Sequence, residues 1–303
     1  MGTDYPRLVK KWVYVSILLV MLVVLSRGIF TRTCPMKPEL GFLAKTENKS
    51  SEQPADPNQL SEQKQEAAKE KGKRGPEHTH PAFSQRRHER EEMVAEQIQS
   101  RGVNSRDVLN AIETVPRHAF VRARDSSSAY DDRPLPIGLG QTISQPYIVG
   151  YMTEALKLRP DFRILEIGTG SGYQAAVCAE IAQEVYTIEI IKELAEPAEK
   201  RLKDLGYNNV SVKAGDGYFG WVEKGPFDAI IITAAAGLVP PPLVKQLKPD
   251  GRMILPLGSP FGAQTLVLIT KDNKGSVQSK SLLPVQFVPM VGHITEVEQS
   301  SQK

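Results

Sequence analysis

The sequence lacks the features that mark several classes of protein. It contains only two cysteines, Cys34 and Cys178, far apart in segments of different character, so no disulfide framework is implied. The net charge is only +3, and basic residues are spread among acidic ones, so nothing indicates a nucleic-acid partner. No G-x-x-x-x-G-K-[ST] motif occurs, which excludes a P-loop nucleotide-binding protein.

Long apolar stretches are also scarce. The main one, residues 12–25, is an uncharged run of 14. A bilayer-spanning helix needs about 20 apolar residues, whereas the core of a signal peptide needs about 7–15. We therefore predict that residues 1–30 are a hydrophobic membrane-targeting segment, with membrane association through residues 12–30. An anchor is preferred to a cleaved signal peptide, and an over-long start is a third alternative.

The next stretch is short of large apolar side chains. From about Lys45 onward Glu, Gln, Lys, Ser and Pro dominate, so we predict a disordered polar tether over residues 31–85. His78 and His80 lie in this stretch without a third ligand and do not favour a metal site. Residues 297–303 form a polar tail, which leaves residues 86–296 as the folded domain.

In the first part of the folded domain the apolar residues have helical spacing, and in the second part short apolar strands alternate with helices. REEMVAEQIQSRGV, SRDVLNAIET and YIVGYMTEALKL predict helices, with Ser105 as the candidate N-cap of the second. From Phe162 onward short apolar strands alternate with helices, which predicts an α/β fold with a doubly wound, mostly parallel sheet. TLVLITK, a turn at DNKG and SLLPVQFVPMV predict an antiparallel hairpin at one edge of that sheet. Cys178, within the helical QAAVCAEIA, is interpreted as a small buried hydrophobe.

A glycine-rich turn follows the first predicted strand, FRILEI. It consists of Gly168, Thr169, Gly170, Ser171 and Gly172. Glycines here let a ligand approach the backbone closely. The spacing is G-x-G-x-G, whereas a dinucleotide fingerprint would need glycine in place of Tyr173. Glu166 precedes the turn, where negative charge disfavours a phosphate and suits a cationic or polyhydroxylated ligand.

Two more acids end the next two predicted strands. They are Glu189 and Asp216, the latter followed by Gly217. Each acid alone can be a solvated loop carboxylate, but the carboxyl ends of parallel strands meet at one edge of the sheet, so their joint placement favours one site. Glu189 is suited to ribose hydroxyls and Asp216 to an adenine amino group. A positively charged nucleoside without a phosphate clamp suggests S-adenosylmethionine (SAM) as cofactor, with no metal.

Several motifs carry a family resemblance. LEIGTGSGY, VYTIE and GDG resemble the pattern of Rossmann-like class I SAM-dependent methyltransferases. AIETVPRHAF, GQTISQP, FDAIIITAAA, QLKPDGRMILPLG and FVPMV are similar, in that order, to the protein-L-isoaspartate O-methyltransferase family from about Glu91 to Val291. The resemblance implies methyl transfer from SAM to the α-carboxylate of L-isoaspartyl residues in damaged proteins, followed by succinimide formation and partial return to aspartate.

The stretch GQTISQP, residues 140–146, reads on its own as a stiff, extended surface turn. The resemblance implies that it forms the acceptor side of the site. Ser144 is then the catalytic hydrogen-bond donor, and substrate contacts come from Thr142, Ile143 and Gln145. A carboxylate is already ionised at neutral pH, so the reaction needs no general base.

Four other side chains near these motifs are further candidates for the site. His118 and His293 are the alternative bases and are interpreted as structural or exposed. Tyr130 and Asp132 are further candidates for the border of the site.

The cofactor also bears on location. SAM is made in the cytosol, so we predict a cytoplasmic catalytic domain, either membrane-tethered or translated from an internal start such as Met36 or Met93, with export as the alternative. Three rival functions remain: a SAM-dependent methyltransferase with another acceptor, an NAD-dependent oxidoreductase, and a non-catalytic membrane-tethered binding module.

Overall fold

The computed structural model describes residue 76 and residues 78–259, 262–295 and 297. The predicted membrane-targeting segment, nearly all of the predicted tether and most of the polar tail therefore lie outside the described residues. Within the described ranges, no helix combines the length and the apolar character needed to cross a bilayer.

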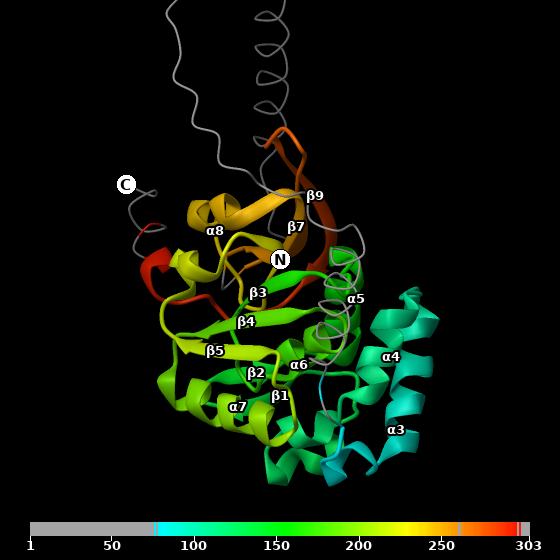
Figure 1. The fold of residues 1–303 in the computed structure, drawn as a ribbon. Helices are drawn as coiled ribbons and strands as arrows, with labels where there is room; N and C mark the ends of the chain where they lie inside the picture. The colour runs from blue at the N-terminus through cyan, green and yellow to red at the C-terminus, as the bar shows by residue number, and fades with distance from the viewer. Residues whose placement is uncertain (1–75, 77, 260–261, 296, 298–303) are drawn as a thin grey trace, which may run out of the picture. The chain divides into compact units, whose positions relative to one another are not determined.

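A helical region is followed by alternating strands and helices (Figure 1). The helices are α3 (Arg87–Glu92), α4 (Arg106–Thr114), α5 (Pro146–Leu156), α6 (Tyr173–Ala179), α7 (Lys192–Asp204) and α8 (Pro241–Gln246). The strands are β1 (Leu135–Gly138), β2 (Gln141–Ile143), β3 (Arg163–Ile167), β4 (Glu184–Glu189), β5 (Val210–Ala214), β6 (Phe227–Ile232), β7 (Leu247–Gly258), β8 (Gln264–Lys271) and β9 (Val277–Val285). Short 3-10 turns occupy Pro81–Phe83, Gln99–Arg101, Arg117–Phe120, Ala123–Ser128, Gly217–Phe219 and Val222–Lys224, and Met93–Ile98 is a π-helical segment.

The main sheet has the strand order β5-β4-β3-β6-β7-β8-β9. Strands β3 to β7 pair in parallel, and β8 and β9 add antiparallel pairs at one edge. Both the doubly wound sheet and its edge hairpin are thus confirmed. The chain runs outward from β3 through β4 to β5, and then returns to β6 on the other side of β3. This reversal creates a topological switch point at the carboxyl ends of β3 and β6, where α/β sheets bind ligands.

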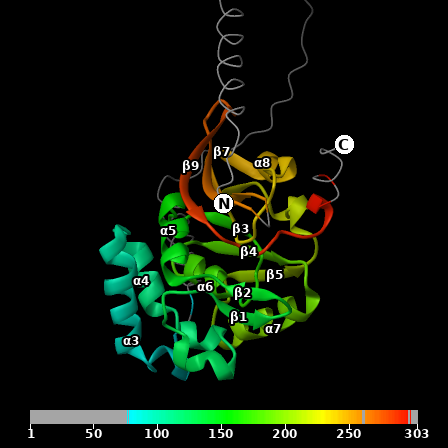
Figure 2. The same ribbon diagram turned by 180° about the vertical axis from the view of Figure 1, so that it is seen from behind.

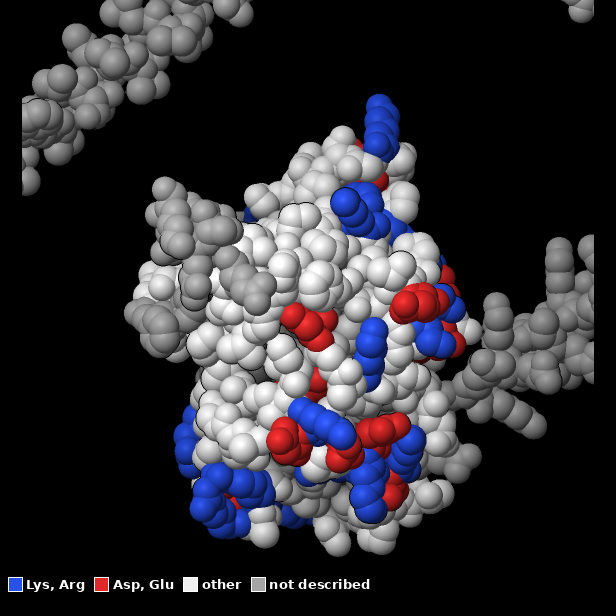
Figure 3. Space-filling view, turned by 90° about the vertical axis from the view of Figure 1, so that its left-hand side faces the viewer, with Lys and Arg blue, Asp and Glu red and all other residues white. Residues whose placement is uncertain are grey.

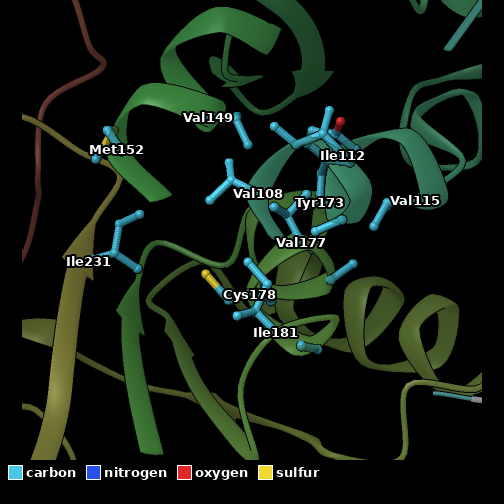
Figure 4. Close-up of a cluster of buried hydrophobic side chains, with 14 of the residues drawn as sticks. Val108, Ile112, Val115, Val149, Met152, Tyr173, Val177, Cys178, Ile181 and Ile231 are labelled. Carbon is cyan, nitrogen blue, oxygen red and sulfur yellow. The ribbon is translucent and has the colours of Figure 1, made fainter. Parts of the chain in front are cut away.

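Alternate residues of the central strands face two separate cores. In β3, Ile164 belongs to the core that includes side chains of α4, α5, α6 and α7, whereas Leu165 packs on the opposite face with Leu243 of α8. Figure 4 shows part of the first core, where Val108, Val149, Cys178 and Ile231 converge. Cys178 is fully buried, as expected of a small hydrophobe. Both faces are covered at the centre of the sheet, so β3 and β6 are buried nearly throughout, whereas the edge strand β9 is mostly exposed.

The folded part begins before residue 86, the start that the composition predicts. His80 caps the 3-10 turn Pro81–Phe83 by accepting a hydrogen bond from Ala82 N, and Ala82 is buried in the core. The polar composition of this stretch hides the boundary because a single small apolar residue suffices to dock a short turn.

Helices α3 and α4 lie together beside α5 in both ribbon views, away from α8 (Figures 1 and 2). Ser105 occupies the N-cap position of α4, which confirms the predicted start of the helix, but its side chain makes no capping bond. Glu154 of α5 performs the task instead, since its Oε1 accepts from the backbone N of Asn104 (2.6 Å) and Ser105 (2.7 Å). A tertiary contact has replaced a local one.

The stretch GQTISQP is partly a strand, which its sequence does not predict. Residues of β2 pair antiparallel with β1, and the turn between them contains Gly138, Leu139 and Gly140, all with positive φ (107°, 51° and 73°). Leu139 is the one side chain forced into this left-handed conformation, which favours glycine. The hairpin also touches the glycine turn, because a Cβ on Gly170 would lie 3.3 Å from Ile137 Cδ1.

Charges of both signs are interleaved on the face shown in Figure 3. Among its described residues, that face carries no continuous basic surface of the kind that follows a phosphate backbone.

Candidate active site

The glycine turn after β3 is held tightly between the ends of its neighbours. Gly168 N donates to Ile188 O of β4 at 2.8 Å. Gly168 has φ of 96°, and a Cβ at this position would stand 2.5 Å from Thr233 Oγ1 after β6. Only glycine combines this backbone conformation with so close an approach.

Glu189, the last residue of β4, is tied directly to that turn. Its Oε2 accepts from Gly170 N (2.8 Å) and its Oε1 accepts from Ile191 N (3.0 Å). The side chain is only 6% exposed, and it lines a cavity at the carboxyl edge of the sheet. The carboxylate is therefore held in a fixed orientation, ready to accept further hydrogen bonds from a ligand.

This first cavity, the cofactor-side cavity, contains several predicted residues. It is lined by Gly168, Gly170, Glu189 and Gly217, together with Gln141, Thr142, Thr233 and residues 288–291. Thr169 and Ser171 line a smaller adjoining pocket, together with Ile143, Ser144 and Glu166. The structure thus places all three strand ends of the prediction at one edge.

Asp216 stands apart from the other predicted cofactor residues. Its Oδ1 accepts from Tyr218 N (2.9 Å) and its Oδ2 from His293 N (2.7 Å), so it joins the turn after β5 to the C-terminal segment. It does not line the cofactor-side cavity, although the next residue, Gly217, does. A Cβ on Gly217 would lie 2.3 Å from Ile167 Cγ2, which shows how closely this turn packs on β3.

A second cavity, the acceptor-side cavity, opens beside the first and measures about 460 Å³. Its lining includes the predicted Thr142, Ser144 and Gln145, with Pro134, Ile148, Thr233 and residues 284–288. Thr142, Thr233 and Val288 line both cavities. The two cavities therefore meet at these three residues, which is the geometry needed to bring two ligands into contact.

Two parts of this site were missed by sequence reasoning. Thr233 anchors the glycine turn, since its Oγ1 donates to Ile167 O (3.0 Å) and Gly168 O (2.7 Å). Its position just after β6, at the switch point, is the signal that would have found it. The segment from β9 to Val291 forms a wall of both cavities and is held by buried Gln264, whose Oε1 accepts from Phe287 N at 2.7 Å. This apolar wall carries no local signal, because its role depends on where the edge hairpin returns the chain.

The acceptor-side residues are oriented by contacts behind them. The Ser144 carbonyl accepts from Arg117 Nη2 at 2.8 Å. Gln145 donates from Nε2 to both the backbone oxygen (3.0 Å) and Oδ2 (2.8 Å) of Asp132, which is paired with Arg101 at 2.6 Å. Asp132 thus borders the site indirectly, through Gln145.

Neither candidate histidine lines either cavity. His118 contacts the Tyr130 hydroxyl through Nδ1 (2.6 Å), and burial, reinforced by Arg86 and Arg90, lowers its pKa to about 4. His293 packs against the rings of Tyr218 and Phe219, with centroids 4.8 and 5.1 Å away. Both histidines have structural surroundings rather than the position of a base.

Glu166 is fully buried at the base of the smaller pocket. Thr187 Oγ1 donates to its Oε2, and Thr187 is linked in turn to Thr169. Burial raises the pKa of Glu166 to about 8, and the nearby charge of Glu189 acts in the same direction. Glu166 is therefore largely protonated at neutral pH when the cavity holds no cation.

This raised pKa makes a prediction about stability. The pKa of this carboxyl rises from 4.5 to about 8 on folding. Below pH 4.5 the group is protonated in both the folded and the unfolded state and costs no stability, whereas the free energy of unfolding declines as the pH rises from there toward 8. Glu166→Gln removes that decline. The difference in Tm, variant minus wild type, should therefore increase between pH 5 and pH 8, by about 10 °C. Thermal unfolding of both proteins across this range tests it, and a pH-independent difference would contradict the raised pKa.

The sheet order, the glycine turn at the switch point and the acid at the end of β4 define a Rossmann-like class I methyltransferase fold. The sequence profile of the protein-L-isoaspartate(D-aspartate) O-methyltransferase family matches residues 88–295, so the chain belongs to that family.

Individual relatives agree with this assignment. The protein-L-isoaspartate O-methyltransferase 2 of Syntrophobacter fumaroxidans is 58% identical over 185 residues, 61% of this chain and 75% of the relative. The protein-L-isoaspartate O-methyltransferase 1 of Nitrosospira multiformis is 58% identical over 205 residues, 67% and 87% of the two chains.

Solved structures are similar as well. A protein-L-isoaspartate O-methyltransferase superimposes with a TM-score of 0.65 at 29% identity, covering 70% of this chain and 69% of the other. A putative enzyme of the same kind from Plasmodium falciparum, solved with S-adenosyl-L-homocysteine, has a TM-score of 0.57 at 25% identity and covers 67% and 98%.

Proposed function

We propose that the cofactor-side and acceptor-side cavities are the two halves of one active site, joined at Thr142, Thr233 and Val288. The enzyme is a SAM-dependent protein-L-isoaspartate O-methyltransferase, which transfers a methyl group to the α-carboxylate of L-isoaspartyl residues in damaged proteins. One observation carries the assignment of the two cavities. The cofactor-side cavity, lined by the glycine turn and Glu189, meets the acceptor-side cavity, lined by residues of GQTISQP.

The residues of the cofactor-side cavity fit SAM. We assign SAM binding to Gly168, Gly170, Glu189 and Gly217 of this cavity, to Glu166, Thr169 and Ser171 of the smaller adjoining pocket, and to Gly172 and Asp216, which line neither. Gly168 and Gly170 of the glycine turn line the cavity, and Glu189 offers fixed carboxylate oxygens for the ribose hydroxyls. When bound, SAM supplies an electrophilic methyl group on a positively charged sulfur. That charge would favour ionisation of Glu166, which is otherwise neutral.

The acceptor side must hold a carboxylate oxygen in line with the methyl group. Because an α-carboxylate is ionised at neutral pH, no residue has to remove a proton. We assign the Ser144 hydroxyl as the donor that orients the carboxylate, with Thr142, Ile143 and Gln145 as substrate contacts. Hydroxyl donors orient the nucleophile without the strong ion pair that would reduce its reactivity, and positioning supplies much of the rate.

The reaction has a chemical consequence for the substrate. A methyl ester is a better leaving group than the free carboxylate, so the backbone amide displaces it to form a succinimide. Hydrolysis of that ring returns part of the material to aspartate, and repair requires repeated rounds.

A labelling experiment tests the acceptor. The full chain is given SAM labelled on its methyl group and two peptides that differ only in an isoaspartyl or an aspartyl linkage. Base-labile label is expected on the isoaspartyl peptide alone. If SAM binds but neither peptide is labelled, the acceptor is a different one; if SAM does not bind, a non-catalytic binding module or an oxidoreductase becomes the better reading.

The organisation of the whole chain is a separate proposal. The methyltransferase domain, which begins before the predicted start at residue 86, needs SAM and therefore works where SAM is made, in the cytoplasm. Residues 1–30 would tether it to the membrane through residues 31–85. Protease treatment of intact cells tests this topology, and digestion of the domain from outside would contradict it.

A further inference from the structure

Arg117 is a fully buried guanidinium directly behind the acceptor wall. Its exposed fraction is 0%, and its Nε donates to Ala129 O at 2.8 Å. Its Nη2 donates to the Ser144 carbonyl, also at 2.8 Å, and its Cζ stacks 4.8 Å above the Tyr173 ring centroid. Its Nη1 is buried and has no hydrogen-bond partner in the described part of the chain. These contacts immobilise the side chain and leave its Nη1 without a hydrogen-bond acceptor among the described residues.

Arg117 has no carboxylate partner in the described part of the chain, although carbonyl oxygens and the Tyr173 ring surround its guanidinium. A guanidinium keeps its proton at neutral pH. The negative charge of Asp132 favours the protonated form of Arg117, but Asp132 is already paired with Arg101. Burial raises the pKa of Tyr173 to about 12 and also raises that of Tyr130, so both stay neutral. Burying an unpaired charge is expensive, so its retention at this wall calls for an explanation.

The position of the Arg117 charge beside the acceptor-side cavity supplies this explanation. Ser144 lines the acceptor-side cavity, and Ser144 and Tyr173 both line the smaller pocket beside it. Both contact the guanidinium, so only one layer of residues separates Arg117 from the place where an acceptor would lie. We propose that Arg117 is a positioning residue whose buried charge selects the ionised α-carboxylate of the substrate, acting through the Ser144 segment. This proposal rests on the proposed function.

The reaction itself determines which kinetic constant this charge affects. The bond between the carboxylate oxygen and the methyl carbon forms as the sulfur–methyl bond breaks, with its electron pair staying on sulfur. The negative charge on the carboxylate is lost, and the product is a neutral ester. A buried cation therefore favours the substrate over both the transition state and the product, which increases substrate affinity and promotes product release without increasing kcat.

Arg117→Gln tests the charge, with Arg117→Lys as the charge-retaining partner. We expect Arg117→Gln to weaken binding of an isoaspartyl peptide by about tenfold, from a charge acting through one layer of protein. Binding is measured by calorimetry with S-adenosylhomocysteine present, so that no turnover occurs. Arg117→Lys should recover most of the affinity, whereas kcat should not fall in either variant.

Arg90 offers a matched control. It is also buried, at 2% exposure, and it too has no described carboxylate partner. Its guanidinium donates to the carbonyls of Phe83, Gln85 and Glu113, none of which lines the acceptor-side cavity. Arg90→Gln should therefore lower thermal stability, as Arg117→Gln does, but leave peptide affinity unchanged.

A second measurement needs no variant and holds even if Arg117→Gln does not fold. Wild-type protein should bind a peptide with the free α-carboxylate about tenfold more tightly than the same peptide with a neutral α-carboxamide. Equal binding of the two peptides overturns the proposal, as does equal weakening by Arg117→Gln and Arg117→Lys. Failure of the proposed function looks different, since wild-type protein would then methylate no isoaspartyl peptide at all.

Discussion

Ser144→Ala is expected to lower kcat for isoaspartyl peptide methylation by about a hundredfold, the effect of a small misplacement of the reacting atoms. Ser144 lines the acceptor-side cavity and the smaller pocket but not the cofactor-side cavity, so the affinity for SAM should change much less than kcat. The loss arises because the carboxylate oxygen is no longer held in line with the methyl group. Steady-state kinetics combined with calorimetric titration of SAM separates the two effects.

Ser105→Ala is the matched control for this substitution. The Ser105 side chain makes no capping bond and lies on α4, so its removal should leave both kcat and SAM affinity at wild-type values. An equal loss of turnover and SAM binding in Ser144→Ala would contradict its assignment to the acceptor side.

Glu189→Ala is expected to weaken SAM binding by about a hundredfold, because two hydrogen bonds between a charged carboxylate and the ribose hydroxyls are lost. Part of the effect comes from the protein itself, since Gly170 N and Ile191 N lose their acceptor and the glycine turn is released. Glu189→Gln retains one acceptor oxygen and should fall between Ala and wild type. Calorimetry with SAM measures all three affinities, and kcat at saturating SAM should change much less.

Glu184→Ala provides the comparison at the opposite end of the same strand. Glu184 starts β4 and pairs with Arg163 at 3.0 Å, far along the strand from the carboxyl edge. A partly exposed pair of this kind contributes at most about 1 kcal/mol to stability and nothing to the site. Unchanged SAM affinity in Glu189→Ala would remove Glu189 from the ribose role.

Much of the fold could be predicted because its signals are local. The strands from Phe162 onward are short apolar runs separated by polar turns, and that pattern is dictated by burial on both faces of a parallel sheet. The glycine turn was equally visible, since its backbone conformation excludes other residues. Glu189 could be placed because the end of a strand and the edge of a sheet are the same point in a doubly wound fold.

Other features depend on residues distant in sequence and left no local signal. Glu154 replaces the Ser105 cap only because α5 packs against the start of α4. Thr233 enters the site because β6 lies beside β3, 66 residues away along the chain. The unpaired charge of Arg117 is likewise invisible in PRHAF, since its significance arises from the carbonyl of Ser144 reaching it from another segment.

The sequence by itself determined the alternating strands and helices, the glycine turn and the acidic residues at the strand ends, because each follows from the backbone conformation or burial of nearby residues. Only the tertiary structure decided that burial raises the pKa of Glu166, that the cofactor-side and acceptor-side cavities meet at Thr142, Thr233 and Val288, and that Arg117 lies behind Ser144 without a carboxylate partner among the described residues. Electrostatics and cavity shape depend on which distant segments come into contact, and the packing of helices and loops around the sheet sets those contacts.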